Sequence, residues 1–147
     1  MEEQLLSEAL VSFHSEDIDF KLEEEASIQQ WINVVVEQQK ANLIGLSYIF
    51  CSDAYLHNIN LEYLNHDTLT DIITFPYLTP PDVEGDIFIS IERVRENAQT
   101  FKVPFEQELR RVIIHGVLHL CGQADKTEAE AAEMRRKEEE ALRIFQG

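Results

Sequence analysis

The sequence predicts an α+β fold in which a mixed sheet of about four strands is covered by helices. Short runs that alternate between apolar and polar residues predict the strands, and apolar residues three and four positions apart predict the helices. A length of 147 residues is close to the commonest size of one domain. We therefore expect a single domain over 1–147, with one hydrophobic core and one active region.

The predicted strands are bounded by residues that favour turns. Pro76 ends the third strand or confines it to an edge, because proline cannot donate a hydrogen bond to a neighbouring strand. The proline-rich stretch from Pro76 to Pro81 is expected to be a loop. The four strands are predicted over 10–14, 43–51, 70–76 and 85–90.

Capping residues mark where the predicted helices begin. Ser27, Asp53 and Ser90 each precede a helical pattern, and their side chains can accept hydrogen bonds from the first turn. Thr127 and Glu130 have the spacing of a capping box. The helices are predicted over 27–40, 53–64, 91–101 and 127–145, with a further helix from Pro104 to a stop at Gly122.

The composition limits the classes of function. No apolar run approaches the length that crosses a bilayer, and the acidic N-terminus lacks the positive charge of an export signal. Cys51 and Cys121 have no paired spacing, so we expect reduced thiols in a soluble, cytoplasmic protein. The formal net charge of −16 argues against extensive contacts with phosphate. Much of the acid falls in 23–25 and 128–140, which we expect to be solvated, so a locally positive cleft remains compatible with the sequence.

The segment HGVLHLCGQAD carries the clearest chemical pattern. His115 and His119 are four residues apart, which places both imidazoles on one face of a helix. After the predicted stop at Gly122, Asp125 can fold back toward the same point. Three such ligands leave a fourth tetrahedral position open, as in catalytic zinc sites. We therefore predict one divalent ion per chain, with zinc first and nickel, manganese or iron as alternatives.

Plainer interpretations of these residues also exist. His115 and His119 could be two ordinary helix histidines, and Asp125 an ordinary loop acid. Cys121 is a competing soft ligand, but two residues beyond His119 it points to another helix face, as a core cysteine would.

Missing motifs narrow the chemistry further. Zinc proteases with an H-E-x-x-H motif use the glutamate as general base, and Gly116 stands at that position here. The sequence also lacks the phosphate-binding glycine loops and the G-x-S-x-G nucleophile motif. Metal-assisted chemistry or a metal-stabilised binding module remains.

Three ordered segments resemble the YbeY family of metal-dependent bacterial endoribonucleases. HGVLHLCGQAD resembles the family signature HGxLHLxGxxH, YLNHDTLTDIITFP resembles YRxxDxxTxVLSFP, and GDIFIS resembles a GDIxIx strand. Together with an acidic C-terminal helix, these matches cover over half of the chain. The resemblance implies a single-strand-specific endoribonuclease of 16S rRNA maturation and ribosome quality control, whose partners are rRNA, the small ribosomal subunit and ribosome-associated proteins.

The resemblance also implies roles for individual residues. It makes His115 and His119 metal ligands and puts Asp125 where the family has its third histidine. A carboxylate there lowers the charge of the metal site from about +2 to about +1, which weakens its pull on phosphate. Leu64 stands where the family has an arginine, so it cannot bind phosphate and is expected in the core.

Further candidates lie near the predicted metal site. Thr74 takes the position of a family serine, and both Thr74 and Asp71 could orient substrate or water; Asp71 could equally cap the strand. Arg111, one turn before His115, could bind phosphate or form an ion pair with a nearby glutamate. His66 could also reach the cleft.

Two rival functions remain open from the sequence alone. The first is a metal-stabilised ribosome-assembly factor that binds rRNA or protein without efficient cleavage. The second is a different small metallohydrolase.

Overall fold

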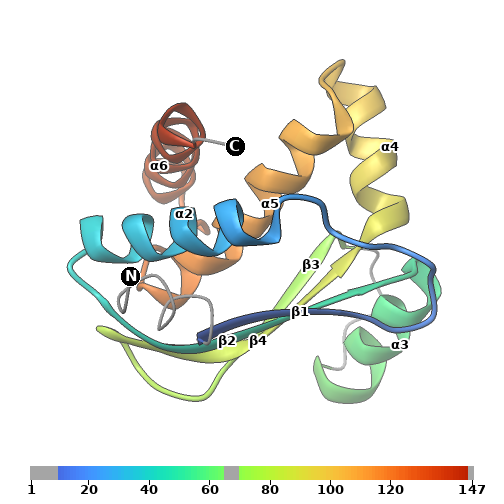
Figure 1. The fold of residues 1–147 in the computed structure, drawn as a ribbon, viewed down its shortest axis with the longest axis horizontal. Helices are drawn as coiled ribbons and strands as arrows, with labels where there is room; N and C mark the ends of the chain where they lie inside the picture. Colours follow the sequence, from blue (N-terminus) through green and yellow to red (C-terminus); the bar gives the residue numbers. More distant parts are fainter. Residues whose placement is uncertain (1–9, 65–69, 146–147) are drawn as a thin grey trace.

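The computed structural model describes residues 10–64 and 70–145, which form an α+β domain (Figure 1). The predicted fold class is confirmed. The elements follow one another as β1 (Val11–Ser15), α2 (Glu25–Gln38), β2 (Asn42–Cys51), α3 (Asp53–Leu64), β3 (Ile72–Pro76), β4 (Asp82–Ser90), α4 (Ile91–Phe101), α5 (Phe105–Leu120) and α6 (Glu128–Ile144).

The sheet is mixed, with strand order β1-β2-β4-β3. β1 and β4 both pair in parallel with β2, so helical crossovers connect these strands. β3 pairs antiparallel with β4 at the other edge. Pro76 ends this edge strand, as predicted.

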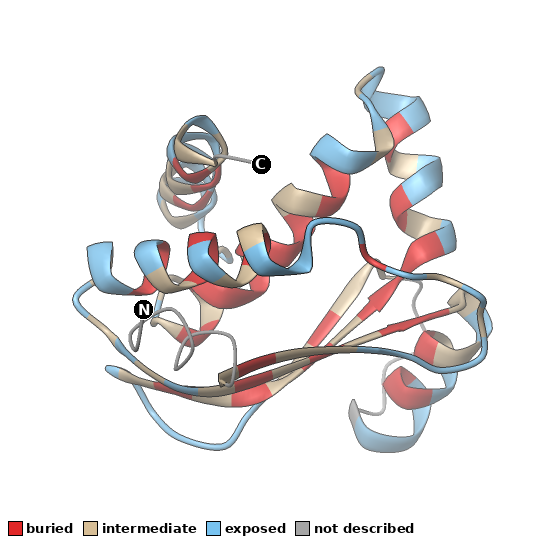
Figure 2. Cartoon of the chain, viewed as in Figure 1, coloured by how far each residue is buried: buried red, intermediate tan, exposed pale blue. Residues whose placement is uncertain are grey.

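Helices cover both faces of the sheet unequally. α2, α4, α5 and α6 lie on one side of the sheet and α3 on the other (Figure 1). Figure 2 shows the buried residues running along α5 and the strands beneath it. Ile113, Ile114 and Val117 of α5 have no exposed surface, like Ile87 of β4. Burial of such side chains is the main stabilising term, so α5 is fixed firmly on the sheet.

Buried hydrogen bonds also fix the helices in place. The Tyr48 hydroxyl of β2 donates to the carbonyl of Ile113 in α5 at 3.0 Å. The Trp31 indole of α2 donates to the carbonyl of Ala141 in α6 at 2.7 Å. Each bond satisfies the one polar group of a large buried ring, and together they set the positions of α5 and α6.

Two predicted caps are wrong, and two are confirmed. α2 begins at Glu25 after Glu24 adopts a left-handed conformation with φ 58°, so Ser27 lies inside the helix. The Ser52 hydroxyl accepts from the amide of Tyr55, which makes Ser52 rather than Asp53 the cap of α3. Ser90 caps α4, and the capping box opens α6 as predicted.

Two predicted strands begin elsewhere, and one predicted core residue is exposed. β4 begins at Asp82, three positions before the predicted start, and β3 begins two positions later than predicted. The sequence pattern of α3 predicts an inward apolar stripe of Leu56, Ile59, Leu61 and Leu64, but Leu61 is 42% exposed. Within the described residues, no helix combines the length and apolar character needed to cross a membrane.

Candidate metal centre

α5 supplies both histidines of the predicted site, and Gly116 between them sets how closely the helix approaches the sheet. A Cβ atom on Gly116 would lie 3.1 Å from the Cδ1 atoms of both Ile72 and Ile87. Glycine therefore lets the last turns of α5 pack tightly against β3 and β4. The histidines on either side are held at a fixed distance from the sheet edge as a result.

A tight turn after α5 returns the chain toward the histidines. Gly122 has φ +107°, which favours glycine, and its amide donates to the carbonyl of His119 at 3.0 Å. The amide of Gln123 donates to the carbonyl of Leu118, also at 3.0 Å. These bonds satisfy the last carbonyls of the helix, and Asp125 follows before the cap of α6.

The three candidate ligands converge on one point. Oδ2 of Asp125 lies 3.4 Å from Nε2 of His115 and 3.2 Å from Nε2 of His119. One ligand atom from each residue lies within 4.8 Å of the others. Ligand atoms about 2.0–2.1 Å from a tetrahedral zinc ion lie about 3.3–3.4 Å apart. The two distances therefore match edges of such a tetrahedron, and the His, His, Asp donor set suits zinc chemically.

The other ring nitrogen of His115 faces a buried acid. Nδ1 of His115 lies 2.5 Å from Oε2 of Glu138, a residue of α6 that is 3% exposed. In histidine metal sites, the nitrogen that does not face the metal commonly donates to a carboxylate or carbonyl. Among the described residues, Nδ1 of His119 has no such acceptor.

Arg111 lies one turn before His115 and is held by two acids. Its guanidinium donates to both oxygens of Glu108 and to Oε1 of Glu138, with a shortest contact of 2.6 Å to Glu108. Burial raises the pKa of Glu108, and the hydrogen bond from Arg111 opposes this shift. Burial alone would lower the pKa of Arg111, but the effect of Glu108 and Glu138 is larger, so the pKa is raised overall. The guanidinium is therefore paired with carboxylates, as one of the two sequence interpretations expected.

A cavity of about 220 Å³ lies beside the candidate ligands. It is bounded by the middle of α5, the first half of α6, the loop between them and the start of β3. Its polar lining consists of Asp71, Arg111, His115, Asp125, Arg135 and Glu138.

Asp71 and Thr74 differ in their relation to this cavity. Asp71 lines it, and its carbonyl accepts from the amide of Ser90 at 3.0 Å. Thr74 lies two residues beyond Ile72 on β3, so it faces α5, but it does not line the cavity. His66 and the side chain of Leu64 lie outside the described residues, and their predicted roles are not tested by the structure.

Cys121 is not part of the cluster. Within the described residues, the group able to hold an ion consists of His115, His119 and Asp125. Burial raises the pKa of the Cys121 thiol to about 11, so the thiol is protonated at neutral pH.

Sequence reasoning missed Glu108, Glu138 and Arg135. A signal for Glu138 was available: it falls on the inward stripe of α6 with Met134 and Ala141, where an acid is unexpected. Glu108 likewise falls one turn before Val112 on the buried side of α5. No pattern in the sequence distinguishes Arg135 from other arginines of α6.

The fold and the site together define a class: a small α+β protein in which a helix-borne histidine pair and a following acid converge beside a polar cavity. Comparison with known proteins gives the family. The family model described as "Endoribonuclease YbeY" matches residues 10–146. The chain belongs to the YbeY family, which confirms the resemblance.

Individual relatives agree with this assignment. A protein of Flavobacterium psychrophilum named "Endoribonuclease YbeY" is 54% identical over 136 residues, covering 92% of this chain and 96% of the relative. A protein of the same name from Flavobacterium johnsoniae is 48% identical, covering 92% of this chain and 97% of its own. The solution structure of TM1509 from Thermotoga maritima is similar with a TM-score of 0.64 and 26% identity, covering 90% of this chain and 86% of the other.

Proposed function

We propose that this chain is a metal-dependent endoribonuclease that takes part in rRNA maturation. The observation that carries the proposal is the convergence of His115, His119 and Asp125 at distances that suit a tetrahedral ion. The names of relatives at 48% and 54% identity supply the reaction class.

The proposed metal is zinc, held by His115, His119 and Asp125. A divalent ion at this position supplies Lewis acidity toward a phosphodiester. Three protein ligands would leave one position of a tetrahedral ion for water or substrate, and the adjoining cavity has room for part of a nucleotide strand. Asp71 lines this cavity and is proposed to orient a substrate group or a water. Thr74, beside it on β3, is proposed to support that orientation.

The proposed RNA contact is the guanidinium of Arg135. Arg111 also lines the cavity, but its donors are taken by Glu108 and Glu138. Arg135 is exposed, and within the described part of the chain it forms no ion pair. Phosphate recognition by arginine is local, so it needs no overall positive charge.

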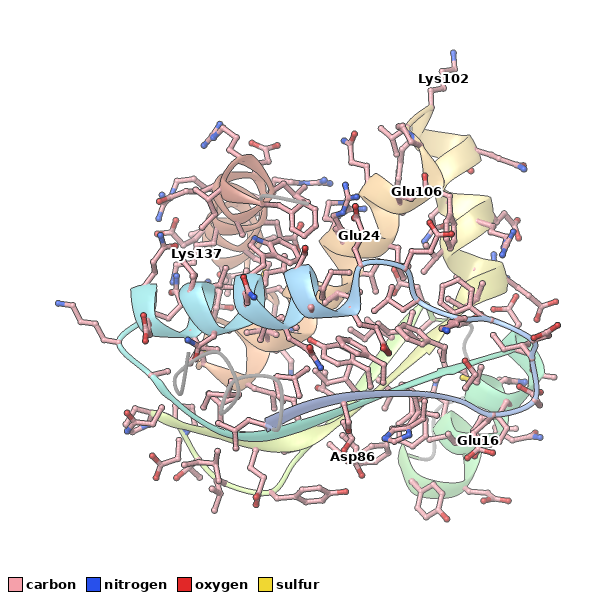
Figure 3. All side chains as sticks on the ribbon, viewed as in Figure 1. Glu16, Glu24, Asp86, Lys102, Glu106 and Lys137 are labelled. Carbon is pink, nitrogen blue, oxygen red and sulfur yellow. The ribbon has the colours of Figure 1, made fainter. Side chains whose placement is uncertain are left out.

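Such local recognition fits the distribution of charge. Figure 3 shows Glu16 and Asp86 near the side of the sheet that faces away from α5 and α6. Lys137 lies on α6, which also carries Arg135 and borders the cavity. RNA contact is therefore expected at Arg135, where α6 borders the cavity, and not along the whole of this acidic helix.

The rival functions have less support. A non-cleaving assembly factor accounts for the charge of −16 and the carboxylate ligand, but the relatives named after the family are endoribonucleases. A metalloprotease needs a general base where Gly116 lies against the sheet. We further propose the small ribosomal subunit and its associated proteins as partners, and the cytoplasm as the place of action, because rRNA precursors are processed there.

The proposal is tested by cleavage of a defined single-stranded rRNA fragment. Protein freed of contaminating ribonuclease is compared with His115→Ala, prepared in parallel, and with parent protein treated with a chelator. We expect cleavage by the parent protein alone, restored after chelation by added zinc. Equal cleavage by His115→Ala would show that the activity does not belong to this site. No cleavage by zinc-loaded parent protein would favour the assembly factor.

A further inference from the structure

Two buried acids and one arginine form a chain of contacts that ends at His115 of the candidate metal centre. Glu108 of α5 is 1% exposed and Glu138 of α6 is 3% exposed. A carboxylate removed from water is costly unless it is paired and hydrogen-bonded. These two acids belong to different helices and share one cation, Arg111, whose side chain lies between them.

The hydrogen bonds divide the oxygens of Glu138 between two partners. Oε1 accepts from Nη1 of Arg111 at 3.2 Å, and Oε2 lies 2.5 Å from Nδ1 of His115. An ionised carboxylate can only accept, so Nδ1 of His115 carries the hydrogen. In the neutral ring, which metal binding requires, Nε2 then carries the lone pair, and this is the atom that faces Asp125 at 3.4 Å.

We propose that Glu138, held in place by Arg111 and Glu108, is the positioning residue that fixes the His115 ring with the Nε2 lone pair toward the metal. The inference rests on the proposed metal centre and adds residues that contact neither metal nor RNA. In this arrangement Arg111 holds the two acids in place and does not bind phosphate. If it moved away, two buried carboxylates would be left without a cation.

The surrounding helices make this arrangement rigid. The carbonyl of Ala141, one turn beyond Glu138, accepts from the buried indole of Trp31. Met134, one turn before Glu138, is 2% exposed and belongs to the main core. Glu138 is therefore fixed on both sides along α6, which a group that orients a ligand requires.

The first test measures zinc affinity by competition with a chromophoric chelator. Glu138→Gln keeps the shape of the side chain but offers His115 a neutral acceptor and presents Arg111 with a donor. We expect the dissociation constant for zinc to rise about 10-fold, and up to about 100-fold in Glu138→Ala. The matched control is Glu139→Gln, which makes the same change at the next, exposed position of α6 and should bind as the parent does.

The second test reads the ring directly. In metal-free protein labelled with ¹⁵N-histidine, at a pH where the ring is neutral, the shifts of His115 should report hydrogen on Nδ1 in the parent and a shift toward the Nε2-protonated tautomer in Glu138→Ala. The double variant Glu108→Gln/Arg111→Met removes one acid and the cation together, and should weaken zinc binding while leaving Glu138 in place. Thermal unfolding identifies the variants that fold, and a role limited to stability would leave the nitrogen shifts unchanged.

The outcomes separate this inference from the proposed function. Folded Glu138→Gln that binds zinc as tightly as Glu139→Gln would overturn the positioning role, as would a neutral His115 ring in the parent protein with hydrogen on Nε2 and none on Nδ1. Parent protein that binds no zinc would instead contradict the metal centre. The nitrogen shifts decide the role of Glu138 in either case, including when Glu138→Ala does not fold.

Discussion

Asp125 supplies the charge that distinguishes this site from one made of three histidines. Its carboxylate lies within 3.4 Å of Nε2 of His115 and of Nε2 of His119. Asp125 belongs to a turn that contributes no residue to the buried core. Replacing a neutral imidazole by a carboxylate lowers the charge of the loaded site from about +2 to about +1. A substitution of Asp125 can therefore keep the metal bound and still change how strongly the site attracts phosphate.

Asp125→Ala should raise the dissociation constant for zinc at least about 100-fold, more than loss of a supporting residue, while leaving thermal unfolding of the metal-free protein nearly unchanged. Asp125→His should keep the metal and hold phosphate at least as well, and Asp125→Asn should bind metal poorly. Isothermal titration with zinc measures these affinities, with the exposed Glu128→Ala as control. Unaltered affinity in Asp125→Ala would make Asp125 an ordinary loop acid and direct the search for a third ligand to Cys121 or water.

The histidine pair could be predicted from the sequence because its spacing and its helix are both local features. The contacts among Glu108, Arg111 and Glu138 could not be predicted, because these residues meet only when α6 packs against α5. The inward position of Glu138 could be read from the stripe that it shares with Met134 and Ala141, but its partners could not. Arg111 was correctly placed near His115, but its partners depend on tertiary contacts.

Hydrogen bonds connect the loop after β1 to the start of α3. Asp17 accepts hydrogen bonds from both the amide and the hydroxyl of Ser52. The hydrogen bond from the Ser52 hydroxyl is the main cause that holds the pKa of Asp17 below its usual 3.8. The same hydroxyl accepts from the amide of Tyr55, so one short network fixes both the loop and the helix cap.

Asp17→Ala should therefore lower the free energy of unfolding by about 0.5–1 kcal/mol at pH 7, a modest value because the carboxylate is exposed. A lowered pKa in the folded state means that the contribution is complete above pH 3.8 and is lost as the pH falls through the lowered value. Denaturant unfolding at several pH values measures this, with Asp19→Ala as the control in the same loop. A difference between parent and variant that stays constant below pH 3.8 would contradict this account of Asp17.

The order and types of the elements could be predicted because hydrophobic periodicity is strong in this chain. The boundaries were less certain. The residue before α2, Glu24, has a left-handed backbone conformation and makes no side-chain cap. Residue preferences do not predict this conformation for a glutamate. The extra length of β4 comes from pairing with β2 from Asp82 onward, a contact between segments far apart in the sequence. Leu61 fits an apolar stripe, but α3 covers only part of its face of the sheet.

The protein is acidic, whereas RNA is anionic, so the two repel each other at long range. The net charge of −16 opposes RNA binding at long range, so affinity has to come from the metal and a few cations near it. The cavity beside the candidate ligands is lined by two arginines, of which Arg111 is paired with buried acids. Recognition is therefore expected to involve few phosphates.

The salt dependence of RNA binding should accordingly be shallow. Each neutralised phosphate of a single strand contributes about −0.7 to the slope of log affinity against log salt, and we expect a total of about −1 to −2. Arg135→Ala should remove roughly one contact and reduce the slope by about 0.7. Fluorescence anisotropy with a labelled single-stranded RNA measures both, with Arg143→Ala on the same helix but away from the cavity as control. A steep slope would reveal a basic surface that the charge distribution does not predict.

Metal occupancy and RNA cleavage can be followed in one sample. Zinc is titrated into chelator-stripped protein while bound metal and the cleavage rate of a single-stranded rRNA fragment are measured together. Both should rise in proportion and reach their maximum at about one ion per chain, because three convergent ligands form one site. Full cleavage by metal-free protein, or a fully occupied site without cleavage, would contradict the proposed function.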